Sequence, residues 1–116
     1  MKFMVKAEGG TTVVTLDGRL DLSTGTNLKE EIKKVCDKGA NRIHLNLQKV
    51  EFINSSGLGS LVSVMKQVRL KKGRLTLSNL APYVREIFDI TQLSNVFEIH
   101  ETQQEALMST GKVAAE

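Results

Sequence analysis

Residues 50–61 are Val50-Glu51-Phe52-Ile53-Asn54-Ser55-Ser56-Gly57-Leu58-Gly59-Ser60-Leu61. The stretch begins as an apolar strand end and continues, after Asn54, with the spacing of an amphipathic helix. Asn and Ser are typical of helix N-termini, because their side-chain oxygens accept hydrogen bonds from backbone N–H groups that lack a partner in the helix. Gly57 and Gly59 place no side chain on the first turn, so another surface can approach its backbone. We therefore predict a strand–turn–helix junction that presents hydroxyl groups.

A serine at such a junction is well suited to carry a phosphate. A helix N-terminus has partial positive charge and free donors, which favour an anion, and phosphorylation adds about 1.5 to 2 negative charges. We predict that Ser55 is exposed at the carboxyl end of a strand and that its phosphorylation prevents another protein from docking. The alternative is that Asn54 and Ser55 only cap the helix and that the glycines only permit tight packing. The two interpretations are compatible, because one serine can cap the helix and also be phosphorylated.

On the N-terminal side of this junction, two strands and a helix are expected. Residues 3–7 and 12–22 alternate apolar and polar side chains, with Leu20 and Leu22 on the apolar side of the second run. A glycine turn separates the two runs, which predicts a hairpin. From residue 24 to 38 the apolar side chains recur at helical spacing. The candidates for the cap of this helix are Ser23, Thr24, Thr26 and Asn27.

A third strand at 43–47 precedes the junction, and helical and strand-like segments alternate after it. These are a helix after Asn54, a strand at 74–78, a helix from Pro82, a strand at 96–99 and a helix opened by Thr102. The order β-β-α-β-α-β-α-β-α predicts an α/β fold with parallel pairing after the hairpin. Because several strands alternate instead of being apolar throughout, we expect a small mixed sheet of four or five strands. About four helices should lie mainly on one face of it.

The composition of the 116 residues is that of one soluble domain, which we place at residues 1–109, followed by a frayed tail at 110–116. Aromatic residues make up only 4%, which argues against a nucleic-acid surface built on base stacking. The net charge is +3, and the basic cluster at 66–74 is either a solvated helix end or a contact for an acidic partner. The single Cys36 fits a reducing compartment, and no stretch resembles a signal peptide or membrane span. We therefore expect a cytoplasmic protein that binds neither nucleic acid nor membrane.

Nothing in the sequence predicts catalysis. His44 and His100 have no partners at metal-ligand spacing, and we expect solvated or structural roles for both. Ser55 lacks the flanking glycine pattern of a nucleophile elbow, and Gly57-Leu58-Gly59 lacks the third glycine and the lysine of a phosphate-cradling loop. We predict no metal, no cofactor and no enzymatic activity. A small enzyme or nucleotide-binding protein built on the serine-rich turn is a remaining alternative.

The segment from Phe52 to Gly59 resembles the signature of the bacterial anti-sigma factor antagonists, in the STAS-domain family. Two further stretches resemble the same family. They are Gly18-Arg19-Leu20-Asp21, and Leu77-Ser78-Asn79-Leu80 with the residues from Val84 to Leu93. The resemblance covers about residues 3–108, nearly the whole chain.

The resemblance implies a protein that binds an anti-sigma factor and thereby releases a sigma factor. In the family the anti-sigma factor is an ATP-dependent serine kinase. It phosphorylates the first serine of the motif, which is Ser55 here, with Ser56 as the second candidate. The phosphorylated form does not bind, and a serine phosphatase restores it; the kinase holds the ATP and magnesium, so this chain needs neither. We expect a monomer or a weak dimer. The expected partner-binding residues are Asn54, Ser55, Ser56, Gly57, Leu58, Gly59, Asp21, Ser23 and Thr24.

One position departs from the family pattern. Asn54 stands where the family usually has Asp, which preserves the capping ability but removes a negative charge. Members of the family without a competent phosphosite often bind constitutively. The alternative function is therefore an adaptor that is not phosphorylated and binds a transporter ATPase or a stress-signalling scaffold.

Overall fold

The computed structural model describes residues 1–109, so the tail predicted at 110–116 lies outside the described residues. The elements are β1 (Lys2–Glu8), β2 (Thr11–Leu20), α1 (Leu22–Asp37), β3 (Arg42–Ile53), α2 (Ser55–Leu70), β4 (Arg74–Ser78), α3 (Pro82–Ile90), the 3₁₀ helix η1 (Leu93–Asn95), β5 (Glu98–His100) and α4 (Gln103–Met108). Apart from η1, this is the order that the periodicity predicts.

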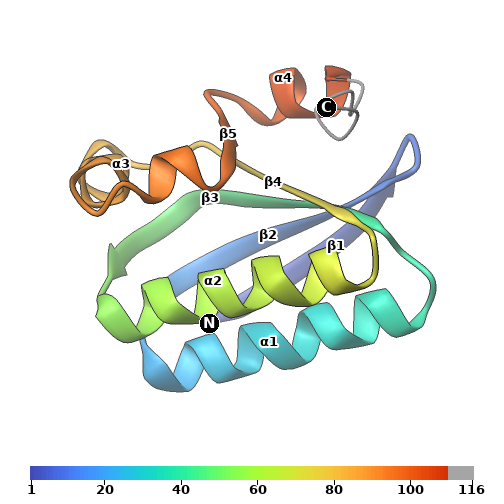
Figure 1. Cartoon of the computed structure of the whole chain (residues 1–116), viewed down its shortest axis with the longest axis horizontal. Helices are drawn as coiled ribbons and strands as arrows, with labels where there is room; N and C mark the ends of the chain where they lie inside the picture. Colours follow the sequence, from blue (N-terminus) through green and yellow to red (C-terminus); the bar gives the residue numbers. More distant parts are fainter. Residues whose placement is uncertain (110–116) are drawn as a thin grey trace.

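The five strands form one mixed sheet in the order β1-β2-β3-β4-β5. β1 and β2 pair antiparallel as the predicted hairpin, and all later neighbours pair parallel. The parallel part brings the carboxyl ends of β2, β3 and β4 to one edge, where α1, α2 and α3 begin (Figure 1). The predicted α/β fold is confirmed, and the junction at residues 50–61 lies at this edge.

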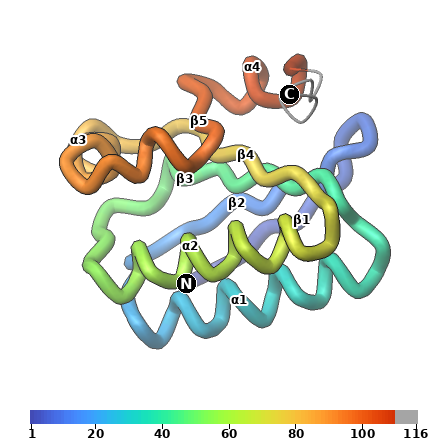
Figure 2. Tube along the Cα trace, viewed as in Figure 1, coloured from blue at the N-terminus to red at the C-terminus, as the bar shows by residue number. Residues whose placement is uncertain are grey.

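The two longest helices, α1 and α2, cover one face of the sheet. α1 and α2 lie side by side against it, whereas α4 crosses the opposite face (Figures 1 and 2). The apolar side chains of β2, β3 and β4 meet those of α1 and α2 in one buried cluster, which Val84 and Phe88 of α3 also join. Phe88 packs edge-on against Phe97, with 5.5 Å between the ring centroids. The expectation of helices mainly on one face is confirmed.

None of the helices within residues 1–109 combines the length and the apolar character needed to cross a bilayer.

The start of α1 differs from the prediction. The helix begins at Leu22, and its N-cap is Asp21, not one of the four later candidates. Asp21 Oδ1 accepts a hydrogen bond from Thr24 N (3.1 Å), and Asp21 N donates to Thr24 Oγ1 (2.9 Å). This reciprocal capping box ends the alternating strand two residues earlier than its period suggests. Leu22 therefore lies on the surface, 67% exposed, and not in the core.

The start of the last strand also differs from the prediction. It lies at Glu98 and not at Val96, because Val96 N and Phe97 N donate to Leu93 O and complete the turn of η1. At the end of α2, Lys72 takes the left-handed conformation (φ 59°). The next residue, Gly73, leaves no room for a side chain, since a Cβ there would lie 2.5 Å from the carbonyl oxygen of Asn41.

The face of the sheet beneath α4 buries a polar network. His44, on the polar side of β3, is 0% exposed. Of the two roles expected for it, solvated or structural, the structural one is therefore correct. Its Nδ1 lies 2.7 Å from Thr76 Oγ1, and its Nε2 lies 2.7 Å from Ser78 Oγ. Ser78 donates its own proton to Asn79 Oδ1 (2.6 Å), so it accepts from His44 Nε2–H. Thr76 then donates to Nδ1, and the imidazole is neutral.

This network makes the stability depend on pH. Burial, with a smaller contribution from His100, lowers the pKa of His44 to about 4, from 6.5. As pH falls, the unfolded chain takes up this proton near pH 6.5, whereas the folded chain resists it until about pH 4. We therefore expect His44 to remove about 2.5 kcal/mol of unfolding free energy between about pH 7.5 and pH 4.5. Urea unfolding at the two pH values measures this loss.

His44→Gln is the control, because it keeps a polar side chain that does not titrate. Carboxylates contribute their own acid dependence to both proteins, so the difference between the two slopes isolates His44. An equal loss of stability in both proteins would rule out the assignment to His44.

Candidate functional site

The N-termini of α1 and α2 lie together at the carboxyl edge of the sheet. Asn54 N, just before α2, donates to the carbonyl oxygen of Leu20 (3.3 Å), just before α1. Two glycines allow this close approach. A Cβ at Gly57 would lie 2.2 Å from Leu20 O, and a Cβ at Gly25 would lie 2.0 Å from Ser60 Oγ. Any larger residue at either position would push the helix ends apart.

Asn54 caps α2, and Ser55 does not. Asn54 Oδ1 accepts from Gly57 N (2.9 Å), and its carbonyl oxygen accepts from Leu58 N (2.9 Å). Ser55 and Ser56 occupy the first two helical positions and are exposed. Within residues 1–109, the hydroxyl of Ser55 has no hydrogen-bond partner. Ser55 is therefore not needed as a cap, and its hydroxyl faces solvent.

Four more of the residues predicted to contact a partner divide into two groups by exposure. Gly59 and Ser23 are exposed, and Gly59 lies one turn after Ser55 on the same helix face, with open space around it. Leu58 is half-buried, and Gly57 is buried against β2 of the same chain. The space that Gly57 leaves is thus occupied by this chain, whereas that at Gly59 is available to another protein.

Asp21 and Thr24 have a local structural task. The N–H of Thr24 hydrogen-bonds the Asp21 carboxylate and holds its pKa below the usual range. Thr24 Oγ1 also donates to Arg19 O (2.7 Å), and Ser23 Oγ donates to Asp21 Oδ1 (3.2 Å). The first turn of α1 is therefore held by side-chain hydrogen bonds, and the Asp21 carboxylate stays ionised there.

Three features of this edge were not predicted from the amino-acid sequence. Leu22 is exposed, and Tyr83 of α3 is 45% exposed while its hydroxyl donates to Ile53 O (3.3 Å). The Arg19 guanidinium stacks over Phe52, 3.9 Å from the ring centroid. The pairing of Arg19 with Phe52 follows from the β2–β3 register, which the sequence alone does not specify. We call the exposed set the Ser55 edge; it consists of Leu22, Ser23, Asn54, Ser55, Ser56, Gly59 and Tyr83.

The sequence profile of the STAS domain matches residues 2–106. The chain belongs to the STAS domain family. BtrV of Bordetella bronchiseptica, described as a putative anti-sigma factor antagonist, is 31% identical to this STAS domain over 106 residues, which are 91% of each chain. The resemblance inferred from residues 52–59 is thereby confirmed.

Solved structures agree with this STAS domain in fold. The crystal structure of a putative anti-sigma factor antagonist from Thermotoga maritima has a TM-score of 0.84 at 25% identity, over 90% of this chain and 91% of that one. The structure of unphosphorylated SpoIIAA has a TM-score of 0.70 at 25% identity, over 92% of this chain and 94% of that one. The phosphorylated form of SpoIIAA from Bacillus has a TM-score of 0.68 at 27% identity, over 91% of this chain and 96% of that one. The STAS fold therefore exists in a phosphorylated form in at least one relative.

The start of α2, at the Ser55 edge of this STAS domain, has the backbone chemistry that favours an anion. The N–H groups at the start of α2 have no acceptor inside the helix, and the helix dipole places partial positive charge there. The cap Asn54 is neutral, so it does not repel a phosphate on the neighbouring Ser55. Two exposed apolar side chains belong to the same edge: Tyr83 reaches Ile53 O, and Leu22 follows Leu20, whose carbonyl oxygen accepts from Asn54 N. Both suit contact with another protein.

Proposed function

We propose that this STAS domain is an anti-sigma factor antagonist that is switched off by phosphorylation of Ser55. The observation that carries the proposal is the exposed Ser55 hydroxyl at the first position of α2, with no hydrogen-bond partner among the residues described. The names of the relatives support the same role, and so does the phosphorylated form of SpoIIAA.

In this proposal the unmodified Ser55 edge docks on an anti-sigma factor, which then releases its sigma factor. The anti-sigma factor is a serine kinase that brings ATP and magnesium, and it transfers a phosphate to the Ser55 hydroxyl. A serine phosphatase removes that phosphate. The chain itself acts as a regulator and not as a catalyst, in the cytoplasm where sigma factors work.

The test is phosphorylation by a candidate anti-sigma kinase with ATP, mapped by mass spectrometry. We expect one phosphate on Ser55, none on the Ser55→Ala protein and normal incorporation into Ser56→Ala. The two variants are matched, since both serines are exposed in the first turn of α2 and neither is its cap. Phosphate on Ser56, or on neither serine when the kinase binds the chain, would contradict the proposal.

The identity of Asn54 supports one second candidate, a constitutive adaptor for a transporter ATPase or a stress-signalling scaffold. Such a protein would dock through the Ser55 edge, but it would not need the negative charge of the aspartate that the family usually has at the position of Asn54. Affinity capture on the immobilised chain separates the two candidates. Recovery of a transport ATPase, with no anti-sigma factor, would favour the adaptor.

A further inference from the structure

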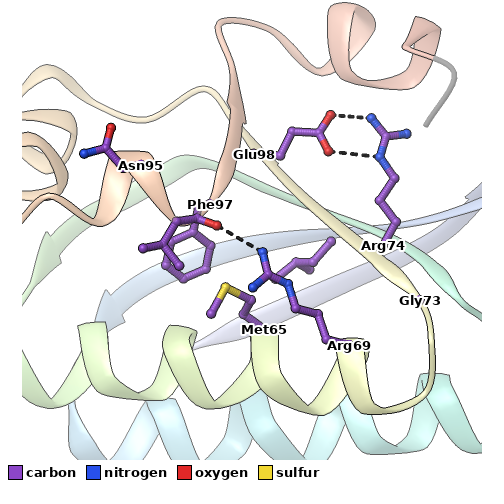
Figure 3. Close-up of a pocket in the computed structure, with 9 residues that line it drawn as sticks. Met65, Arg69, Gly73, Arg74, Asn95, Phe97 and Glu98 are labelled. Atoms are coloured by element: carbon purple, nitrogen blue, oxygen red, sulfur yellow. Dashed lines mark hydrogen bonds and ion pairs between the residues drawn. The ribbon is translucent and has the colours of Figure 1, made fainter. Parts of the chain in front are cut away.

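A cavity of about 500 Å³ lies at the other end of α2 from Ser55. The end of α2, the start of β4 and the η1–β5 segment surround it (Figure 3). At 1.5 Å per residue along α2, Arg69 at this cavity is about 20 Å from Ser55. The cavity is therefore separate from the Ser55 edge, and its volume is in the range of small-molecule sites, about 300–1,000 Å³.

The floor of the cavity is apolar. Met65, Leu75 and Phe97 line it and are themselves buried, so the cavity is recessed into the domain. Val96, which is 39% exposed, forms part of the rim. Such a floor stabilises an apolar group of a ligand by removing it from water, at about 25 cal/mol per Å².

One uncompensated positive charge stands beside this floor. The Arg69 guanidinium donates from Nη2 to Val96 O (3.1 Å) and forms no ion pair with any residue of the described chain (Figure 3). An arginine has five N–H donors, so most of those of Arg69 remain available to a ligand.

The second arginine of the cavity is already neutralised. Arg74 Nε donates to Glu98 Oε1 (3.0 Å), and Arg74 Nη2 donates to Glu98 Oε2. His100 Nε2 also lies 2.9 Å from Glu98 Oε2. Burial raises the pKa of Glu98, but the hydrogen bonds from Arg74 and His100 outweigh it and keep the pKa below its usual value. The cavity thus presents the charge of Arg69 alone.

We propose that this cavity binds a small monocarboxylate with an apolar body, an aryl or medium-chain alkyl acid. The apolar body lies on Met65, Leu75 and Phe97, and the carboxylate accepts hydrogen bonds from the planar Arg69 guanidinium. A single unpaired cation favours a monoanion over a nucleotide or another polyphosphate, whose additional charges would find no partner. This binding site is independent of the proposed switch at Ser55, and the two share no residue.

The test is an NMR titration of the full chain with octanoate, with octanol as the uncharged counterpart. We expect amide shifts confined to residues 65–75 and 95–99, and weaker binding of octanol. Arg69→Gln should weaken octanoate binding about tenfold, the loss of one charge-assisted hydrogen-bonding partner. Lys66→Gln is the matched control, because Lys66 is exposed on the same part of α2 but does not line the cavity, and it should change binding less than about twofold.

A second variant addresses the rim. Val96→Glu places a carboxylate that pairs with Arg69 and repels the ligand, so it should abolish octanoate binding while circular dichroism shows an intact fold. No shifts at millimolar octanoate would overturn the proposal, as would shifts spread over the whole surface. Equal weakening by Arg69→Gln and Lys66→Gln would also overturn it, because it would indicate general electrostatic attraction. None of these results bears on phosphorylation of Ser55.

Discussion

The chain phosphorylated at Ser55 is expected to bind its anti-sigma factor at least a hundredfold more weakly than the unmodified chain, a loss of about 2.7 kcal/mol. The phosphate would be placed at the Ser55 edge, which also exposes the apolar side chains of Leu22 and Tyr83. Docking would remove water from a dianion without supplying a matched cation, which is costly. Isothermal titration calorimetry with both purified forms measures the difference.

The loss should occur without unfolding. Since the start of α2 offers free N–H donors to the phosphate, the melting temperature of the phosphorylated chain should stay close to that of the unmodified chain. Ser55→Ala should bind as well as the wild type, and Ser55→Asp should reproduce only part of the effect, because a carboxylate carries less charge. Equal affinity of the two forms would eliminate the switch. A large fall in melting temperature would attribute the loss of binding to unfolding instead.

The second large effect is expected from Gly57→Ala, which should lower the free energy of unfolding by about 3 kcal/mol. The new Cβ would lie 2.2 Å from the carbonyl oxygen and 2.7 Å from the carbonyl carbon of Leu20. These are backbone atoms, and the same oxygen accepts the Asn54 N–H, so they cannot rotate away. α2 would have to shift as a whole. Urea unfolding measures the change.

Gly59→Ala is the matched control, the same substitution two residues later in the same helix. A Cβ at Gly59 meets nothing within 4 Å, and alanine is the better helix former by about 1 kcal/mol, so this variant should be more stable than the wild type. The two substitutions should therefore move stability in opposite directions. Destabilisation by both, or by neither, would show that contact with Leu20 is not what requires glycine at position 57.

Local patterns were sufficient for much of the fold. Alternation at period two and recurrence at helical spacing give the order of the strands and helices, because burial on one face imposes these periods on each segment separately. They failed where a side chain ends a segment early. Asp21 stands inside an alternating run, yet its capping box with Thr24 starts α1 there and exposes Leu22. The strand ends because of hydrogen bonds between residues three apart, and the apolar–polar alternation contains no information about such bonds.

Only the part of the candidate site that depends on local chemistry was predicted. Residues 50–61 carry enough local chemistry to predict a capped helix start with an exposed serine, and the structure places Ser55 there. The different roles of Gly57 and Gly59 did not follow from the sequence, since both are glycines in one turn. What separates them is the Leu20 carbonyl, which belongs to a strand more than thirty residues earlier.

The element order, the family and the position of the exposed serine could be predicted from residue patterns alone, because each depends on short-range periodicity, capping chemistry or a contiguous motif. Three other features became visible only in the folded chain: the burial of His44 with Thr76 and Ser78, the packing of Gly57 against β2, and the position of Arg69, without an ion-pair partner among the described residues, beside an apolar cavity. These features require the register between parallel strands and the position of α2 on the sheet. Both are set by packing between segments that are distant along the chain, so no local pattern contains them.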